Sequence, residues 1–327
     1  MDADRGLGEV QPLCGAGHAV LGQQGIKGDQ QIEIQSSEIT HLNTGNIGYS
    51  FPIYPTETYP ASLCNGGQVM NILLVYAHPE PRSLNGSLKD FSIKRLEDAG
   101  HTVQVSDLYA MNWKASLDQD DSIDRPAGTR FDPSHESRLA FESGRQSQDI
   151  VLEQNKLRWA DALILQFPLW WFSMPAILKG WVERVYAYGF AYGVGEHSNS
   201  HWGDRYGEGS MTGKRAMLIV TTGGWESHYG PRGINGPIDD VLFPIQHGIL
   251  YYPGFDVLPP FVVYRTSRMD DERFLETCDK LGQRLDDLWN TNPIPYRQQN
   301  AGEYDIPECT LRPEIAPEQV GFAAHIA

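Results

Sequence analysis

The stretch NILLVYAH, residues 71–78, is a short continuous apolar run that ends in a histidine. A run of this length is typical of a β-strand that is buried on both faces, as in a parallel sheet. The run also marks a change in composition, because the residues before it are polar or rich in Gly and Pro and have no sustained period. We therefore expect residues 1–69 to be a largely disordered N-terminal extension, and the folded domain to begin at Met70.

Downstream of this run, apolar segments typical of strands alternate with segments of helical spacing. Further strands are predicted in HTVQVSDLY, ADALILQFPLWWF, KRAMLIVTTGG and FDVLPPFVVY, at residues 101–109, 160–172, 214–224 and 255–264. Helices are predicted from Ser83, as N-cap, to Gly100, and then at residues 149–160, 173–189, 236–250 and 270–289. Residues 108–146 are predicted to be a long polar loop, and residues 291–327 a Pro-rich C-terminal tail.

Five strands that alternate with helices predict an α/β fold, a doubly wound five-stranded parallel sheet with helices on both faces, over residues 70–290. In such a fold a ligand lies outside the carboxyl ends of the strands, near the point where the strand order reverses. The candidate site therefore lies on the loops that follow the first, third, fourth and fifth strands.

The composition excludes several classes of partner. The chain has 327 residues, with 26 basic and 42 acidic ones, so its formal net charge is −16. Such a surface repels nucleic acid and anionic membranes, and no apolar run reaches the roughly 20 residues of a membrane helix. The four cysteines have no CxxC spacing, and the first residues lack the features of a secretory signal or a mitochondrial presequence. We expect a cytoplasmic protein.

The loop AHPEPRSLN, residues 77–85, suits a phosphate. Ser83 and Asn85 stand at the start of a predicted helix, where free backbone N–H groups and the helix dipole favour an anion. An ordinary helix cap explains the same two residues, and on these residues alone it is the preferred interpretation. The loop is neither a GxGxxG nor a GxxxxGK[ST] motif, which argues against Rossmann and P-loop assignments.

The loop FPLWWF, residues 167–172, places three consecutive aromatic side chains directly after a strand. One of Trp170, Trp171 and Phe172 is expected to fill a corner of the core. Three in a row at the ligand edge are hard to bury, so at least one is expected to stack on a flat ligand such as a flavin.

The run TTGGWESHYGPRGING, residues 221–236, is unusually rich in glycine. Glycines directly after a strand let the backbone approach a ligand closely and take positive φ values, so that their N–H groups can bond the edge of a heteroaromatic ring. Tyr229 and Asn235 are close enough in sequence to face one cavity, where tyrosine can donate a proton and asparagine can polarise a carbonyl group. His228 is interpreted as a solvated loop residue.

The histidines do not predict a metal site. His197 and His201 lie four residues apart in EHSNSHWGD, but no predicted helix holds them and no third ligand is obvious. His247 is followed one turn later by Tyr251, so that pair contains only one usual metal ligand. The chain also has no GxSxG motif and no convincing Ser-His-Asp or Cys-His set.

Taken together, the motifs identify a resemblance to the NAD(P)H:quinone oxidoreductase (DT-diaphorase) family, and in particular to its bacterial-type members. The resemblance covers residues 71–290 and rests on the runs QFPLWWFSMPAILKGWVERV, FAYGVGEHS, WGDRYGEG, TTGGWESHYGPRGINGP and FPIQHGIL. It implies a flavodoxin-like fold and a homodimer that holds FAD at sites built from both subunits. It also implies ping-pong transfer of a hydride from NAD(P)H to a small-molecule quinone.

The resemblance further assigns residues to the site. Those assigned to FAD are His78, Ser83, Asn85, Pro168, Leu169, Trp170, Trp171, Phe172, Thr222, Gly223, Gly224, Tyr229 and Arg273. Asp132 and Glu183 match positions that reach the FAD of the partner subunit. The substrate pocket is assigned to Tyr192, Tyr252, Trp171 and Phe172, and the catalytic pair is Tyr229 and Asn235.

Three positions depart from relatives in the family. Val194 stands where the mammalian enzymes have a second pocket tyrosine, which puts the quinone preference in doubt. Asn235 stands where they have a relay histidine, so hydrogen bonding would replace imidazolium formation in stabilising the charge on the reduced flavin. Tyr251 breaks a metal-binding histidine pair that one branch of the family has.

Other interpretations remain open at this point. An enzyme of the same fold can use azo dyes, nitroaromatic compounds or free flavin as the acceptor. A flavin- or nucleotide-binding regulator with little turnover is a second alternative, but it would not need an open aromatic wall. A one-electron flavodoxin-type carrier is a third, but AHPEPRSLN is not the Ser/Thr-rich phosphate loop of that class.

Overall fold

The computed structural model describes residues 69–126 and 128–327. Every described residue belongs to one compact unit. The predicted N-terminal extension, residues 1–69, lies outside the described residues except for Val69.

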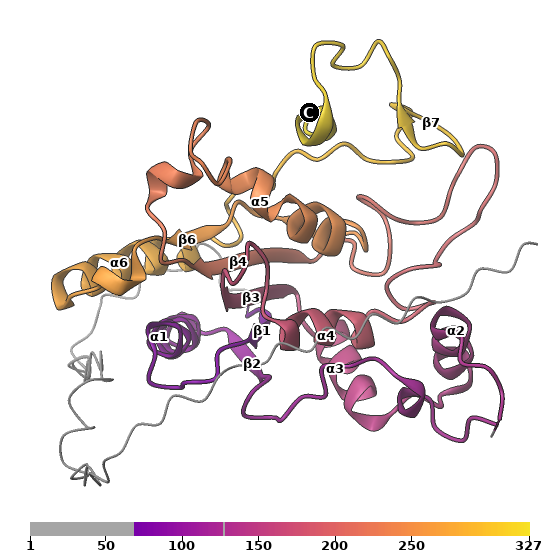
Figure 1. Cartoon of the computed structure of the whole chain (residues 1–327), viewed down its shortest axis with the longest axis horizontal. Helices are drawn as coiled ribbons and strands as arrows, with labels where there is room; N and C mark the ends of the chain where they lie inside the picture. The colour runs from indigo at the N-terminus through magenta and orange to yellow at the C-terminus, as the bar shows by residue number, and fades with distance from the viewer. Residues whose placement is uncertain (1–68, 127) are drawn as a thin grey trace, which may run out of the picture. The chain divides into compact units, whose positions relative to one another are not determined.

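The centre of the described unit is a parallel sheet with the strand order β2-β1-β3-β4-β5, in which a short β6 also pairs with β4 (Figure 1). Its strands are β1 (Asn71–Tyr76), β2 (Thr102–Asp107), β3 (Ala162–Pro168), β4 (Arg215–Thr221), β5 (Asp256–Val257) and β6 (Phe261–Val263). The order reverses at β1, which pairs with β2 on one side and β3 on the other. The predicted doubly wound α/β fold is confirmed.

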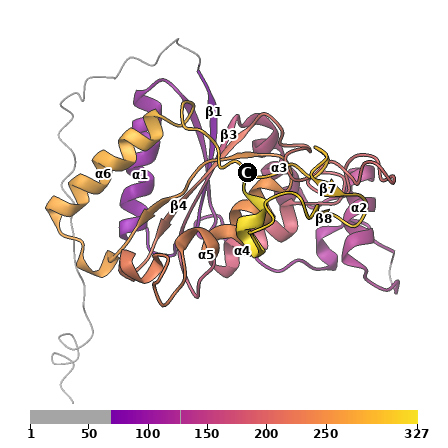
Figure 2. The same cartoon turned by 90° about the horizontal axis from the view of Figure 1, so that it is seen from above.

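Helices cover both faces of the sheet. On one face α1 (Leu84–Asp98) lies beside α6 (Asp271–Asp286), as both views show (Figures 1 and 2). The other face is covered by α3 (Gln148–Trp159), α4 (Ala176–Val185) and α5 (Ile238–Ile245). Among the described residues, no helix combines the length and the apolar character that crossing a membrane requires.

The alternation of side chains along the strands produces two separate cores. Leu73 and Val75 of β1 face the core under α3, α4 and α5, whereas Ile72 and Leu74 face the core under α1 and α6. All four side chains are completely buried. The apolar run at residues 71–78 is continuous because both faces of the strand are covered, as expected for a parallel sheet.

The prediction that residues 108–146 form one long loop is wrong. Helix α2 spans Pro133–Ser143, and a 3-10 turn precedes it at Gln119–Asp121. Asp132 caps α2 by accepting the N–H of His135, and Gly144 ends the helix at φ 68°. The sequence DP at the start and Gly at the end signal such a helix, but its weak apolar periodicity hides it.

The single fifth strand predicted at residues 255–264 is also wrong. The chain pairs with β4 twice, first through β5 and then through β6, and the ladder is interrupted between them. Pro259 and Pro260 fall in this interruption. Proline has no N–H group to donate to a ladder, so the two prolines break the strand.

The predicted helix at residues 236–250 is not uniform. It begins as α5 and continues as a π-helical turn, Gln246–Tyr251. Pro244 lies inside α5, where it removes one backbone donor and favours irregular hydrogen bonding. The irregular turn carries His247 towards Tyr206, with ring centroids 4.7 Å apart.

The tail, residues 291–327, packs on this irregular helix. It contains the small hairpin β7 (Tyr304–Asp305) and β8 (Thr310–Leu311) and a 3-10 turn at Gly321–His325. The Phe322 ring stacks on Phe243 at 4.2 Å, and Phe243 stacks in turn on His247 at 4.6 Å. The tail therefore extends the aromatic packing around α5.

The enclosed imidazole of His247 predicts a loss of stability in acid. Burial, with a smaller contribution from His325, lowers the pKa of His247 from 6.5 to about 4. As the pH falls from about 6.5 towards 4, the unfolded chain takes up a proton that the folded chain refuses, so folding is destabilised. At pH 5 the free energy of unfolding is lowered by about 1–2 kcal/mol for this reason.

Urea unfolding at pH 7 and pH 5 checks this expectation. His247→Gln removes the titrating group, so the variant should lose about 1–2 kcal/mol less than the wild type between the two pH values. An equal loss in both proteins would contradict a role for His247.

Candidate active site

The loops that follow β1, β3, β4 and β6 are joined at the carboxyl edge of the sheet. The N–H of Leu169 donates to the carbonyl of Thr221 at 2.8 Å, and the N–H of Thr222 donates to Val263 at 2.8 Å. The Arg265 N–H donates to the carbonyl of Gly224 at 2.9 Å. These bonds place three of the four predicted loops side by side, where the fold class predicts the ligand.

The N-terminus of α1 brings the fourth loop to the same edge. Ser83 is the N-cap, as predicted, and its Oγ accepts the N–H of Gly86 at 3.2 Å. The Ser83 Oγ also lies 3.0 Å from Nδ1 of His78, which accepts the N–H of Glu80 at 3.1 Å. Burial lowers the pKa of His78, so its ring is neutral near pH 7. The helix N–H groups therefore supply positive potential at this end, beside Arg82, whose charge is paired with Glu80 at 3.1 Å.

Gly86 in the first turn of α1 permits the close approach of this loop. A Cβ atom at this position would lie 1.8 Å from the carbonyl oxygen of Pro81. Only glycine therefore allows the loop to fold back onto the helix. Gly86 is absent from the site predicted from the sequence, although a glycine three residues after a Ser N-cap was an available signal.

Asn85 points into the protein. Its amide group is buried, and Nδ2 donates to Oγ1 of Thr221 at 2.8 Å. Its backbone carbonyl accepts from Nε2 of the buried Gln166 at 2.6 Å. The structure thus gives Asn85 a supporting part, linking α1 to β3 and β4, while its predicted contact with a phosphate remains a prediction.

The aromatic residues after β3 form an exposed and strained turn. Trp170 and Ser173 exchange both backbone hydrogen bonds, at 3.0 and 3.1 Å, so Trp171 and Phe172 occupy the two central positions. Both have left-handed backbones, with φ 50° and 60°, which costs about 1–3 kcal/mol for each non-glycine residue. Trp171 is 95% exposed and Phe172 is 53% exposed. Strain and exposure together indicate a binding function more than a structural one.

The residues flanking this turn have other surroundings. Pro168 is the buried last residue of β3, and Leu169 packs against the core. The Trp170 ring, which is 42% exposed, lies 6.0 Å from that of His78. Of the five aromatic-loop residues predicted to contact a flavin, Trp170, Trp171 and Phe172 therefore offer the accessible surface.

The two glycines after β4 differ in what surrounds them. A Cβ atom on Gly223 would meet nothing within 4 Å, whereas one on Gly224 would lie 2.7 Å from the Tyr229 ring. Neither has a positive φ, so that part of the prediction is wrong; Gly236 is the glycine of residues 221–236 that does, at 77°. Gly224 is required by packing, and Gly223 leaves the strand end open.

Tyr229 and Asn235, the predicted catalytic pair, lie on one loop. In the described part of the chain, no hydrogen bond joins their two side chains. Tyr229 ends a 3-10 turn, Glu226–Tyr229, and its hydroxyl group lies 3.1 Å from Oγ1 of Thr222. Asn235 is held through its backbone, because its N–H donates to the carbonyl of His228 at 3.0 Å. The loop brings Tyr229 back against the end of β4 and leaves the Asn235 side chain half-buried.

Two arginines at this edge have different parts. Arg273 donates to the carbonyl oxygens of Tyr264, Arg265 and Arg268 at 2.7, 3.0 and 3.2 Å, which holds the loop after β6. The Arg265 guanidinium lies 3.8 Å from the centre of the Trp225 ring, beside the glycine-rich loop. Arg265 is missing from the sequence-based site, although its place directly after the last strand was a usable signal.

The remaining predicted residues lie on other parts of this chain. Asp132 caps α2, which lies on the opposite side of the sheet from α1 in both views (Figures 1 and 2). The Tyr192 ring packs on Tyr188, whose N–H donates to Ser137 of α2 at 3.1 Å. These contacts connect Tyr192, through Tyr188, to helix α2.

Glu183 and Tyr252 belong to two further elements, helix α4 and the end of the π-helical turn. Glu183 is exposed on α4 and pairs with Lys179 at 2.6 Å. Tyr252 follows the π-helical turn, and its ring lies 5.0 Å from that of Tyr206. The described residues record no ring contact between Tyr192 and Tyr252, and their part in a substrate pocket stays a prediction.

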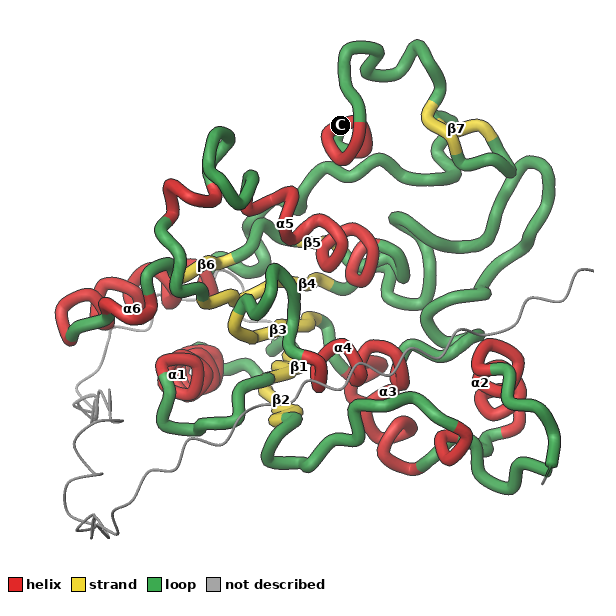
Figure 3. Tube along the Cα trace, viewed as in Figure 1, coloured by secondary structure: helices red, strands yellow, loops and turns green. Residues whose placement is uncertain are grey.

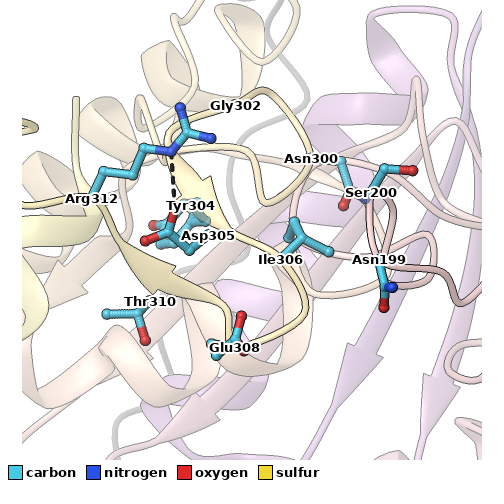
Figure 4. A pocket seen from close by; sticks show the side chains of 10 residues that line it. All are labelled: Asn199, Ser200, Asn300, Gly302, Tyr304, Asp305, Ile306, Glu308, Thr310 and Arg312. Carbon is cyan, nitrogen blue, oxygen red and sulfur yellow. Dashed lines mark hydrogen bonds and ion pairs between the residues drawn. The ribbon is translucent and has the colours of Figure 1, made fainter.

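An open cavity of about 720 Å³ lies apart from the strand-end loops. It is lined by Asn199, Ser200 and part of the tail from Asn300 to Arg312, and the sticks in Figure 4 show Ser200 beside Asn300. None of the predicted site residues lines it. The cavity is therefore not the candidate active site.

Comparisons with known proteins identify the family to which the chain belongs. Residues 70–285 match a family model described as flavodoxin-like fold. A ribosyldihydronicotinamide dehydrogenase-like protein of Penicillium crustosum is 55% identical over 257 residues, 78% of this chain and 95% of that protein. NAD(P)H dehydrogenase [quinone] 1 of Rattus norvegicus is 37% identical over 253 residues, 77% of this chain and 89% of that protein.

A solved structure is also similar. A Klebsiella pneumoniae protein assigned as a quinone reductase is 67% identical in sequence and superposes with a TM-score of 0.78. The match covers 79% of this chain and 100% of that one. The range of the family model, residues 70–285, spans the strands of the sheet.

Proposed function

We propose that this chain, which belongs to the flavodoxin-like fold family and is related to the quinone dehydrogenases, is an FAD-dependent NAD(P)H:quinone oxidoreductase. It would transfer two electrons as a hydride, from the nicotinamide to a small quinone, in a ping-pong cycle. We further propose that it acts in the cytoplasm, since its described cysteines, Cys278 and Cys309, are free thiols.

The exposed turn Trp170–Phe172 is the observation that carries this proposal. A monomeric protein rarely leaves adjacent large aromatic side chains in solvent, and here they are also held at φ 50° and 60°. The turn stands beside the open strand end at Gly223, with the N-terminus of α1 on the same edge. This combination supports the binding of a ligand that has a flat ring system and attached phosphates.

FAD fits these residues better than a small anion does. The aromatic turn offers a stacking surface, Gly223 and Gly224 offer backbone N–H groups, and the first turn of α1 offers donors for phosphate. When bound, FAD supplies the hydride chemistry. The protein holds it, excludes water with the aromatic turn and provides hydrogen-bond donors from Tyr229 and Asn235.

We propose a homodimer, because several residues that the resemblance assigns to the site belong to elements other than the strand-end loops. Asp132 and Tyr192 lie near α2, and Glu183 lies on the exposed side of α4. We propose that these residues, with Tyr252, complete the site of a partner subunit. Each of the two sites would then combine the strand-end loops of one chain with the α2 region of the other.

Asn235→Ala tests the proposed catalytic pair. Removing a hydrogen-bond donor that faces developing negative charge should slow hydride transfer by about tenfold or more, while FAD remains bound. Stopped-flow bleaching of the flavin absorbance by NADPH without oxygen measures this step directly. His228→Ala is the matched control. The His228 side chain is exposed, and His228 contacts Asn235 only through its backbone carbonyl, which the substitution keeps. Unchanged reduction in Asn235→Ala would remove Asn235 from the mechanism.

The proposed function is tested by identifying the cofactor and measuring turnover. The purified protein should be yellow and release FAD, and menadione should give parallel double-reciprocal plots with NADH or NADPH. Release of FMN would favour a different flavodoxin-like reductase or a carrier. Protein that cannot be reconstituted with any flavin would refute the proposal, and flavin binding without quinone turnover would favour a regulator.

The same assay separates the other acceptors and donors. Faster turnover with an azo dye or a nitroaromatic compound than with any quinone would indicate the alternative reductase. Dihydronicotinamide riboside should be included as a donor, since the Penicillium crustosum relative is named for it.

A further inference from the structure

A cluster of metal-ligand side chains lies outside the candidate active site. The long connection between α4 and β4 has neither helix nor strand (Figure 3), and it carries His201, Asp204 and Glu208. One ligand atom from each lies within 4.8 Å of the other two. His201 Nε2 is 2.8 Å from Oδ1 of Asp204 and 3.9 Å from Oε2 of Glu208.

The loop is shaped to hold the Asp204 carboxylate in this place. The N–H of Asp204 donates to the carbonyl of Val194 at 2.9 Å, and that of Gly203 donates to Glu196 at 2.8 Å. A Cβ atom on Gly195 would lie 2.2 Å from Oδ1 of Asp204, and Gly195 has φ 81°. The carboxylate therefore occupies space that only a glycine leaves free.

The two carboxylates lack a compensating basic side chain. Among the described residues, His201 is the sole ion-pair partner of Asp204 and of Glu208. The neighbouring Arg205 is directed elsewhere, donating from Nε to Oε1 of Gln299 at 2.7 Å. The cluster therefore brings two carboxylates together with no lysine or arginine paired to either of them in the described part of the chain.

We propose that His201, Asp204 and Glu208 bind a divalent cation, and that Zn²⁺ fits the set best. One imidazole nitrogen and two carboxylate oxygens are usual zinc ligands, with the fourth position left to water. In a tetrahedral site with bonds of about 2.1 Å, ligand atoms lie about 3.4 Å apart. The observed separations bracket this value, so rotation of the side chains completes the site.

This proposal revises the expectation, drawn from the sequence, that the chain has no metal site. In the sequence, His197 and His201 lie four residues apart, and no third ligand is obvious. The structure instead turns His197 onto the Trp202 ring, with centroids 5.3 Å apart, and brings the two carboxylates to His201.

Asn300 supports the cluster from the tail. Its Nδ2 donates to Oε2 of Glu208 at 2.8 Å and to the carbonyl of Gly203 at 3.0 Å. A hydrogen bond of this kind orients a ligating carboxylate. Asn300 also lines the cavity in Figure 4 next to Ser200, so a bound cation would fasten the loop to the tail at the edge of that cavity.

Competition between the flavin-loaded, full-length protein and a chromogenic chelator for Zn²⁺ tests the proposal. One equivalent of Zn²⁺ should bind per chain, and Asp204→Asn combined with Glu208→Gln should weaken binding by about 100-fold. Asn300→Ala should weaken it by about tenfold. His197→Gln removes a neighbouring histidine outside the cluster and should leave the affinity unchanged. Equal affinity in the wild type and the double variant would overturn the proposal.

A second measurement does not depend on the variants being equally well folded. Zn²⁺ should slow tryptic cleavage after Arg205 in the wild type, because the cation holds the loop on both sides of that residue. The protection should disappear when a chelator removes the cation. Cleavage at the same rate with and without Zn²⁺ at pH 7.5 would also overturn the proposal, whatever the enzyme activity.

Discussion

Gly86→Ala is expected to lower the free energy of unfolding by about 2–3 kcal/mol and to weaken flavin retention at least tenfold. The new methyl group would lie 1.8 Å from the carbonyl oxygen of Pro81, so the backbone of the loop before α1 must move. Overpacking against backbone costs about 1–3 kcal/mol, because backbone cannot rotate away as a side chain does. The same movement disturbs Ser83 and the N–H groups at the start of α1.

Denaturant unfolding and the dissociation constant for FAD measure the two effects separately. Gly282→Ala is the matched control, since it also replaces a buried glycine within a helix. There the methyl group would approach the Phe91 side chain at 3.4 Å, an ordinary contact. Greater helix propensity should make this control neutral or more stable by up to about 1 kcal/mol. Equal stability of the Gly86→Ala protein and the wild type would show that the loop is not packed as described.

Replacing both Trp171 and Phe172 by glycine is expected to change stability and binding in opposite directions. Glycine takes positive φ without strain, so the folded protein should gain about 1 kcal/mol after the greater entropy of the unfolded chain is subtracted. The variant also loses most of the exposed aromatic surface, so FAD affinity should fall by about 100-fold. An increase in stability together with a loss of binding would show that strain is retained here for function.

Thermal unfolding of the flavin-free proteins and flavin titration measure these changes. Leu152→Gly is the control for stability, because Leu152 is similarly exposed but lies in helix α3. This change should cost about 1 kcal/mol. A double-glycine variant that binds FAD as tightly as the wild type would remove the aromatic turn from the site.

The fold could be predicted from the sequence wherever a local pattern had one structural solution. The run at residues 71–78 can form a strand, and its unbroken apolar character requires cover on both faces. Ser83 and Gly100 bound the first helix because a side-chain cap and a left-handed glycine satisfy the helix ends locally. These features need no information from distant residues.

The errors arose where such signals conflicted or were weak. Residues 255–264 have the composition of a strand, but Pro259 and Pro260 leave β4 with two short partners instead of one. Helix α2 has good end signals, but only Glu136 and Ala140 of its residues are buried. Its apolar pattern is therefore too sparse to predict a helix.

Apart from α2 and the division between β5 and β6, the sequence alone determined the alternation of strands and helices. It also determined the four loops at the carboxyl edge and the chemical character of each loop, because periodicity and turn residues act over a few positions. Only the tertiary structure decided how side chains are used there. It turned Asn85 inward to Thr221, required glycine at position 86 and held Trp171 and Phe172 exposed at positive φ. It also brought Asp204 and Glu208 to His201. These outcomes depend on contacts between segments and on loop conformations, and no local pattern specifies which groups such packing brings together.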